Sequence, residues 1–311
     1  MKAVILDAET LGKGIDLSAI EKSVDELILY DSTTPEQVNE RINDAEIVIT
    51  NKVVINEQAI ESAEQLKLIC VLATGMNNID LAAAKKLNIP VKNVEAYGTE
   101  SVVQHTLMMM LSLATKQPVM QKRVAAGDWQ SSSMFCLLDP SIIQLAGKKL
   151  VIVGSGELGQ EVKTLAEALG MHVEFSARPG KKDDPRPTLN ELLPSADVIS
   201  FHCPLTDDTK NSLNADNLKL CKKDALIINN ARGGVINEQD VVEALRAGEI
   251  GGVAADVLPQ EPPKGGNPLL DAMNEGLNLI VTPHNAWTSP EARQRIVELT
   301  AENIQSIQGK N

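Results

Sequence analysis

Short runs of β-branched and aliphatic residues alternate with helical segments along almost the whole chain. This alternation predicts parallel strands, because each parallel connection needs a crossover that covers one face of the sheet. In the first third the predicted strands are Ala3–Leu6, Glu26–Tyr30, Ile47–Ile49, Leu68–Leu72 and Val91–Val94, with helices at 35–42 and 57–62. The chain is therefore predicted to be of the α/β class.

A second series of strands begins at residue 150. Its predicted members are Leu150–Val153, His172–Phe175, Val198–His202, Ala225–Asn229, Gly252–Val257 and Leu279–Thr282. Six such strands suffice for a complete doubly wound domain of the Rossmann type. The first series predicts a smaller flavodoxin-like unit.

The segments between and after the two series set the domain boundaries. Residues 98–117 form an apolar, Met-rich stretch that begins like a helix, and we expect it to cross between the domains. The chain is helical again over 291–307, which is too short for a domain, so we expect this helix to return to the first one. The predicted division is 1–98 with 289–311 and 99–288, with hinges near 98–100 and 287–290.

Composition excludes several function classes. The 311 residues carry 29 Lys and Arg against 42 Asp and Glu, a net charge of −13. Without a clustered basic face, neither nucleic acid nor an anionic membrane surface is an expected partner. The longest apolar run is shorter than the ~18 residues of a membrane helix. The four cysteines lack metal-ligand spacing. We expect a cytoplasmic protein without a metal.

A glycine-rich motif follows the first strand of the second series. It has the sequence Gly154-Ser155-Gly156-Glu157-Leu158-Gly159 and precedes a helical segment. In G-x-G-x-x-G the first glycine permits a tight turn, the second lets the backbone approach a pyrophosphate, and the third lets the helix pack closely. The motif predicts a dinucleotide site. The alternative is an ordinary strand-to-helix turn.

The end of the next strand bears on the choice of cofactor. A carboxylate there usually binds the ribose of NAD, but Glu174 lies inside the strand and the tip is Ser176-Ala177-Arg178. Arg178 could pair with a 2′-phosphate, which Ala177 would not repel. The tip therefore favours NADP within an NAD(P) site. Alternatively, Arg178 is a solvated turn residue and NAD binds without the usual carboxylate.

One ionisable residue stands near the end of each of the last three predicted strands, namely Arg232, Glu261 and His284. Strand ends in an open α/β sheet converge on one crevice. Arg232 could bind a carboxylate in a bidentate fork. His284 could exchange a proton at the neighbouring oxygen, while Glu261 on its other nitrogen fixes the tautomer. Taken singly, these residues could instead be a loop cation, a solvated turn and a buried histidine.

Five ordered motifs resemble the D-isomer-specific 2-hydroxyacid dehydrogenase family. They are the glycine motif, His202-Cys-Pro-Leu-Thr, Asn230-Ala-Arg-Gly-Gly, Asp256-Val-Leu-Pro-Gln-Glu-Pro and Pro283-His284. The resemblance covers nearly the whole length and implies the Arg, Glu and His roles above, a closure of two domains and a homodimer. The chain is most similar to the glycerate dehydrogenase (hydroxypyruvate reductase) branch.

The resemblance also implies further site residues. Backbone amides of Thr74, Gly75 and Met76 would bind the substrate carboxylate. Further expected substrate-site residues are Lys52 and Trp287. Asp256 would bind the nicotinamide carboxamide. Other expected cofactor residues are Ser176, Ala231, Cys203 and Pro204. Trp129 could reach a neighbouring subunit's pocket or belong to a dimer core. For His105 we expect a core hydrogen bond.

The leading expectation is an enzyme that reduces hydroxypyruvate or glyoxylate to D-glycerate or glycolate. Two alternatives remain. One is a 3-phosphoglycerate dehydrogenase-like enzyme, although the acidic chain offers no long-range attraction for a phosphorylated acid. The other is a non-enzymatic NAD-sensing scaffold of the corepressor type.

Overall fold

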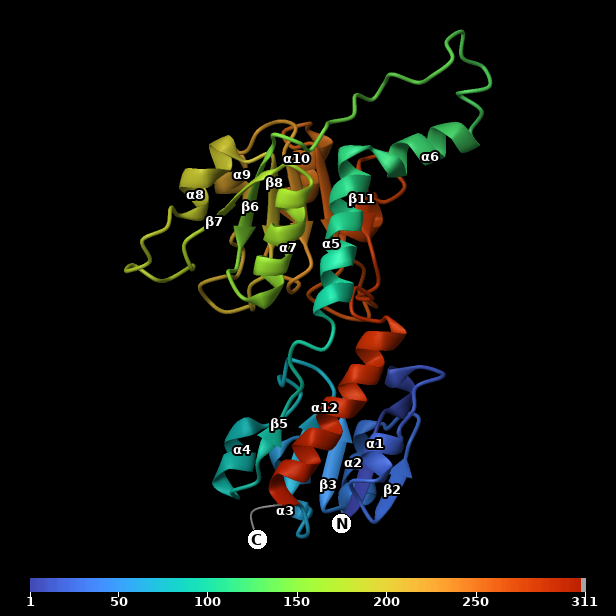
Figure 1. Ribbon diagram of the computed structural model, residues 1–311, viewed down its shortest axis with the longest axis vertical. Helices are drawn as coiled ribbons and strands as arrows, with labels where there is room; N and C mark the ends of the chain where they lie inside the picture. Colours follow the sequence, from blue (N-terminus) through green and yellow to red (C-terminus); the bar gives the residue numbers. More distant parts are fainter. Residues whose placement is uncertain (309–311) are drawn as a thin grey trace. The chain divides into compact units, whose positions relative to one another are not determined.

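The computed structural model describes residues 1–308 (Figure 1). The chain forms two compact units, one from Met1–Gly98 and the segment that begins at Trp287, the other from Thr99–Ala286. Each unit is built on one parallel sheet with helices on its faces. The predicted class, α/β with two doubly wound parallel sheets, is confirmed.

The first unit has five strands in the order β2-β1-β3-β4-β5, which is the flavodoxin-like order. They are β1 (Lys2–Ile5), β2 (Glu26–Leu29), β3 (Ile47–Thr50), β4 (Leu68–Val71) and β5 (Val91–Lys92). Its helices are α1 (Ser18–Glu21), α2 (Val38–Ile42), α3 (Glu57–Ser62), α4 (Leu81–Lys86) and α12 (Pro290–Gln308), with 3₁₀ turns at Ala8–Leu11 and Pro35–Gln37. Every residue of β3 and β4 is buried, because helices cover both faces.

Helix α12 completes the core of the first unit although it comes from the end of the chain. It packs on α1 and β4. Its fully buried Ile296 and Ile304 lie in one cluster with Ile5 and Cys70. The apolar face of α12 therefore replaces a helix that the first 98 residues lack on this side of the sheet.

The second unit has six strands in the order β11-β10-β9-β8-β6-β7. They are β6 (Lys149–Val153), β7 (His172–Phe175), β8 (Val198–Phe201), β9 (Leu226–Asn229), β10 (Gly252–Ala255) and β11 (Leu279–Val281). Its helices are α5 (Thr99–Ala114), α6 (Gln117–Ala125), α7 (Glu157–Ala168), α8 (Leu189–Leu192), α9 (Ala215–Leu218), α10 (Glu238–Arg246) and α11 (Pro268–Ala272), with a 3₁₀ turn at Leu193–Ser195. Helix α5 packs on α7, β9 and β10.

The position of β7 at the edge of this sheet matters for the site. The usual six-strand dinucleotide order places the third strand beside the second. Here β8, the third strand, pairs with β6, so β7 has one neighbour only within the described sheet. The segment after β7 contains Pro179, Pro185 and Pro187, and proline cannot donate to a strand ladder. A polar loop therefore follows β7 where another strand would otherwise lie.

Some predicted elements differ from those observed. The stretch 98–117 begins as a helix, as expected, but it holds α5 and the start of α6, because Lys116 between them has a φ of +54°. The helix predicted over 35–42 begins as a 3₁₀ turn behind the capping residue Thr34. The strand predicted over 91–94 pairs only at Val91–Lys92. Most other strand ends differ by one or two residues.

Candidate active site

Three glycines shape the turn between β6 and α7. Gly154 has a φ of +115°, and a Cβ there would lie 2.3 Å from the carbonyl oxygen of His202. A Cβ on Gly159 would lie 2.1 Å from the carbonyl oxygen of Gly154. A Cβ on Gly156 would instead meet no atom of the described chain within 4 Å. The turn therefore leaves space before α7 that fits a pyrophosphate at the helix N-terminus.

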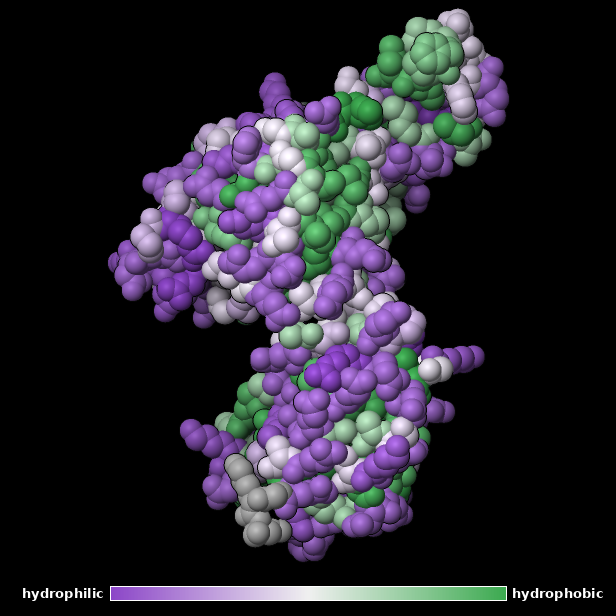
Figure 2. Space-filling view, viewed as in Figure 1, coloured by the Kyte–Doolittle hydropathy of each residue, from purple (hydrophilic) through white to green (hydrophobic). Residues whose placement is uncertain are grey.

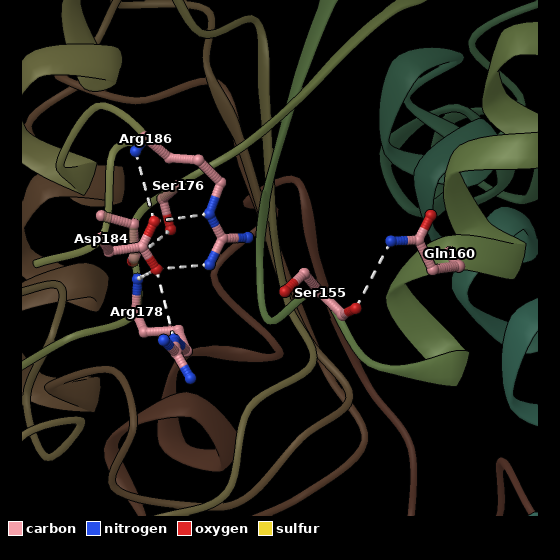
Figure 3. A network of polar contacts seen from close by, with 7 residues as sticks. Ser155, Gln160, Ser176, Arg178, Asp184 and Arg186 are labelled. Carbon is pink, nitrogen blue, oxygen red and sulfur yellow. Dashed lines mark hydrogen bonds and ion pairs between the residues drawn. The ribbon is translucent and has the colours of Figure 1, made fainter. Parts of the chain in front are cut away.

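The other residues of this motif are held by neighbours. The Glu157 carboxylate accepts from Thr99 Oγ1 at 2.7 Å. The carbonyl of Ser155 accepts from the Gln160 side chain at 3.4 Å (Figure 3). Leu158 is half-buried and packs against the cluster beneath the sheet. These contacts hold the glycine motif at the first turn of α7.

A histidine and a glutamate form an ion pair at the ends of β11 and β10. Nδ1 of His284 lies 2.5 Å from Oε2 of Glu261. The second carboxylate oxygen, Oε1, accepts the amide of Leu258 at 2.8 Å. Both side chains are about one-third exposed, at 30% and 34%. Because Nδ1 faces Glu261, Nε2 is the nitrogen that can face a reacting oxygen.

The backbone of His284 is held by Asp256. His284 has a φ of +52°, and its amide donates to the Asp256 carbonyl at 2.8 Å. The buried Asp256 carboxylate accepts the amides of Asn285 and Ala286, each at 3.0 Å. It also accepts the Thr282 hydroxyl at 2.5 Å. These bonds stabilise a left-handed conformation that a histidine seldom adopts.

His105 on α5 joins this network through the hydrogen bond that the sequence led us to expect. Its Nε2 lies 3.0 Å from Thr282 Oγ1 and 3.5 Å from Asp256 Oδ1. Burial lowers the pKa of His105, and the nearby Asp256 carboxylate opposes that shift. His105 therefore supports the base of the turn through its contacts with Thr282 and Asp256.

A cavity of about 340 Å³ opens beside the ion pair. Its lining includes Glu261, His284 and Asp256 together with apolar side chains from α11 and β11, namely Leu270 and Val281. Apolar walls around a few converging polar groups are typical of sites for small molecules. The ion pair is thus accessible to a ligand.

Arg232 follows β9, the strand next to β10 in the sheet. Its Nη1 donates to the Ala231 carbonyl at 2.7 Å, and the Asn229 side chain donates to the Arg232 carbonyl at 2.9 Å. A Cβ on Gly233 would lie 2.0 Å from the Leu258 carbonyl carbon, so the Arg232 loop contacts the backbone that carries Glu261. The predicted convergence of these loops at one edge is therefore present.

The tip of β7 matches the expectation in part. Glu174 lies within β7 and pairs with Lys149 at 2.7 Å. Ser176 is buried, and its hydroxyl donates to the Ala177 carbonyl at 3.2 Å. The Arg178 side chain is 63% exposed but is not simply solvated, because its Nε donates to Asp184 at 3.3 Å (Figure 3).

The remaining expected cofactor residues follow β8 and β9. Cys203 and Pro204 follow β8, and burial raises the pKa of the Cys203 thiol to about 11. Ala231 is buried and its amide donates to the Asn229 side chain at 3.1 Å. Cys203 is thus a neutral, buried side chain just after the carboxyl end of β8.

The expected substrate residues Lys52, Thr74, Gly75 and Met76 lie in the first unit. Lys52 follows β3, and its side chain is exposed. Thr74 follows β4 and donates its hydroxyl to the Val94 carbonyl at 3.2 Å, while Met76 packs on the core. Trp287 also belongs to this unit, where its ring meets Tyr97 edge to face at 6.2 Å.

Asp7, at the end of β1, holds the loop that carries Lys52. Its side chain accepts the amides of Asn51 at 2.9 Å and Lys52 at 2.7 Å. It also accepts the amide of Val53 at 3.3 Å and the hydroxyl of Thr50 at 3.2 Å. Asp7 is 5% exposed, so this carboxylate is a buried anchor for the loop.

Comparison with known proteins identifies the family. The profile of the family described as "D-isomer specific 2-hydroxyacid dehydrogenase, NAD binding domain" matches residues 107–286. A glycerate dehydrogenase of Methylorubrum extorquens is 41% identical over 98% of this chain and 96% of its own length. The chain belongs to the D-isomer specific 2-hydroxyacid dehydrogenase family.

Other relatives agree with this assignment. A hydroxypyruvate reductase of Blautia hydrogenotrophica is 37% identical over 99% of this chain and 97% of its own length. The structure of an acyclic imino acid reductase in complex with NADPH and D-Arg has a TM-score of 0.82 at 26% identity and covers 100% of this chain and 98% of that one. Relatives named D-3-phosphoglycerate dehydrogenase match at lower identity. The predicted family and the prediction of an NAD(P)-dependent enzyme are confirmed.

Within residues 1–308 of this dehydrogenase, no helix is long and apolar enough to span a bilayer. The same residues contain no group of three His, Cys, Asp or Glu side chains arranged to hold a metal ion.

The sequence analysis did not identify three residues that the structure brings into the candidate sites of the dehydrogenase: Asp7, Asp184 and Arg186. Asp184 and Arg186 bond to each other at 2.6 Å in the loop after β7. Two carboxylates and four cations within 178–186 were a visible signal of a charged loop. The sequence held no comparable signal for Asp7, since its partners lie more than 40 residues away.

Proposed function

We propose that this dehydrogenase reduces hydroxypyruvate to D-glycerate and glyoxylate to glycolate. The observation that carries the proposal is the His284–Glu261 ion pair at 2.5 Å, set beside a small cavity. The relatives named glycerate dehydrogenase and hydroxypyruvate reductase support this choice of substrate.

The chemistry requires one hydride and one proton. A nicotinamide cofactor held at the glycine motif would supply the hydride. His284, protonated on both nitrogens, donates the Nε2 proton to the carbonyl oxygen as negative charge develops there. Glu261 stabilises the imidazolium through Nδ1 and fixes the ring. In the reverse direction, neutral His284 accepts the hydroxyl proton.

Arg232 is assigned to the substrate. Its guanidinium is planar and always charged, so it can bind the carboxylate and polarise the neighbouring carbonyl. We assign the backbone amides of Thr74, Gly75 and Met76, with Lys52 and Trp287, to the same substrate. Asp256 is buried, and we assign it to holding the His284 turn; contact with the nicotinamide carboxamide stays a prediction.

For the cofactor we propose that NADPH is used at least as efficiently as NADH. Ala177 at the tip of β7 carries no charge that could repel a 2′-phosphate, and Arg178 is exposed beside it. Residues of the glycine motif, with Ser176, Ala231, Cys203 and Pro204, would surround the rest of the dinucleotide.

We further propose that the dehydrogenase is a homodimer formed through its second unit. Five apolar residues after α6 are exposed, and Figure 2 shows hydrophobic surface at the end of this segment: Trp129 (52%), Met134 (49%), Phe135 (91%), Leu138 (69%) and Ile142 (59%). Exposed apolar clusters of this kind mark association surfaces. Light scattering should give a dimer for the native chain and a monomer for Phe135→Asp.

A substrate panel tests the proposed function. Hydroxypyruvate, glyoxylate, pyruvate and 3-phosphohydroxypyruvate are each offered with NADH and with NADPH. The proposal predicts the highest kcat/KM for hydroxypyruvate or glyoxylate. A higher kcat/KM for 3-phosphohydroxypyruvate would favour the phosphoglycerate alternative instead.

A further inference from the structure

The loop between β7 and α8 is a basic segment in an acidic protein. From Arg178 to Arg186 it holds four cations and two carboxylates, whereas the whole chain carries a net charge of −13. The loop begins at the tip of the strand that ends closest to the expected ribose position. It is therefore placed to attract an anion on that ribose.

The ends of this loop are joined by the backbone. The amide of Ala177 donates to the Pro187 carbonyl at 2.7 Å. Near the start of the loop, the Lys181 amide donates to the Arg178 carbonyl at 3.1 Å. Closure of the loop brings Arg178 and Arg186 to the same carboxylate although they are separated in the sequence.

That carboxylate belongs to Asp184. Its Oδ2 accepts the Arg178 amide at 3.0 Å, Arg178 Nε at 3.3 Å and Arg186 Nη2 at 2.6 Å. Its Oδ1 accepts the Arg186 amide at 3.2 Å and Arg186 Nε at 2.9 Å. The Asp184 side chain is only 3% exposed. Covered by five donors, Asp184 is not available to accept a ribose hydroxyl.

The charge of Asp184 is permanent at ordinary pH. The Arg186 side chain and the Arg178 amide hold the pKa of the Asp184 carboxyl well below its usual range. One carboxylate between two guanidinium groups leaves a net positive charge. The two-point contact to Nε and Nη2 also fixes the plane of the Arg186 guanidinium.

In the view of Figure 3 the Arg186 guanidinium lies between Asp184 and Ser155 of the glycine motif, whereas the Arg178 side chain extends on another side. The Arg186 side chain is 27% exposed, and its Nη1 is not among the atoms bonded to Asp184. Arg186 therefore keeps one terminal nitrogen, Nη1, for a ligand while Nε and Nη2 stay bonded to Asp184.

We propose that Arg186 is a specificity-determining residue of the cofactor site, which together with Arg178 binds the 2′-phosphate of NADPH. Asp184 holds both guanidinium groups in place before the phosphate arrives. This inference rests on the proposed cofactor site but not on the proposed keto acid.

Two mononucleotides that differ by the 2′-phosphate test the inference on the full-length protein. Calorimetry gives the dissociation constants of 2′,5′-ADP and 5′-AMP. A lost contact to a charged phosphate corresponds to about 10- to 100-fold in affinity. Arg186→Ala should therefore reduce the preference for 2′,5′-ADP over 5′-AMP by at least about 10-fold. Arg186→Lys, which keeps the charge but not the fork, should give a smaller reduction.

Lys182→Ala is the matched control. Lys182 is an exposed cation in the same loop that donates none of the described bonds to Asp184. Its removal should leave the preference unchanged within 2-fold. An unchanged preference in both Arg186 variants, or an equal loss in Lys182→Ala, would overturn the inference.

This binding measurement tests Arg186 independently of the proposed substrate, because no keto acid is present. Strong 2′,5′-ADP binding with no reduction of hydroxypyruvate would contradict the proposed substrate and leave the role of Arg186 standing. If the native protein reduces hydroxypyruvate but does not prefer 2′,5′-ADP, the proposed substrate stands and the role of Arg186 is contradicted.

Discussion

Nδ1 of His284 and Oε2 of Glu261 lie 2.5 Å apart, and the Leu258 amide holds the other oxygen of the same carboxylate. The Glu261 side chain is thus fixed at both oxygens, and it fixes the imidazole in turn. The orientation of the His284 imidazole, and with it the proposed proton transfer from Nε2, therefore depends on Glu261.

Glu261→Gln should slow the reduction. A neutral amide stabilises the imidazolium less than a carboxylate does and holds the ring less firmly for proton transfer. The expected loss in kcat is about 10-fold, smaller than the loss of the acid itself. Glu275→Gln, at an exposed ion pair with Arg246, should leave kcat unchanged. A native kcat in Glu261→Gln would contradict the role of Glu261.

Ala177→Asp should change the cofactor preference. A carboxylate at the tip of β7 would repel the 2′-phosphate, and we expect the KM for NADPH to rise about 10- to 100-fold. The KM for NADH should stay or fall, because the new carboxylate can accept ribose hydroxyls. Ala177→Asn, of the same size but uncharged, is the control. Equal effects of Asp and Asn on NADPH would show that size rather than charge decides.

Asp7→Asn should weaken the loop that carries Lys52. An amide cannot accept the four donors that the Asp7 carboxylate holds. The free energy of unfolding should fall by about 1.5–3 kcal/mol, the worth of a charged hydrogen bond. The KM for the keto acid should rise while the NADPH dissociation constant stays constant. Asp31→Asn, at an exposed position, should change neither quantity. Native stability and a native KM in Asp7→Asn would contradict the proposal that Asp7 anchors the Lys52 loop.

His202 should make stability depend on pH. Burial lowers the pKa of His202 from 6.5 to about 4, and its shielded Nδ1 has no hydrogen-bond partner within the described residues. Because the folded pKa is lower, the unfolded chain binds more protons, so the contribution is complete above pH ~6.5 and is lost as pH falls toward 4. Denaturant titrations should show up to about 3 kcal/mol of this loss between pH 7 and 4. His202→Asn should reduce it, and His172→Asn on the exposed strand edge should not. Equal slopes for all three proteins would contradict the assignment.

The sequence predicted the sheets well, because their strands are continuous apolar runs that helices bury on both faces. It also placed Glu261 beside His284 and the Arg232 loop against the backbone at Leu258, since neighbouring parallel strands end at one edge and each residue follows such an end. The helix start at Thr99 was also predictable, but the sequence did not show that one left-handed residue, Lys116, divides α5 from α6.

The contacts that the sequence could not predict are those made by loop closure. Asp184 meets Arg178 and Arg186 only because Ala177 bonds to Pro187 across the loop. Asp7 meets the amides of Asn51 and Lys52 only because β1 and β3 are neighbours in the sheet. Such pairings depend on the backbone path of polar segments, for which apolar periodicity carries no information.

The most direct test of the central claim is the rate of hydroxypyruvate reduction by His284→Ala, measured beside its NADPH dissociation constant and beside the native enzyme. Loss of the positioned acid should lower kcat by about 10²- to 10⁴-fold, with the NADPH dissociation constant within about 2-fold of native. Reduction at a near-native kcat in His284→Ala would contradict the account, because the proton would then come from another group.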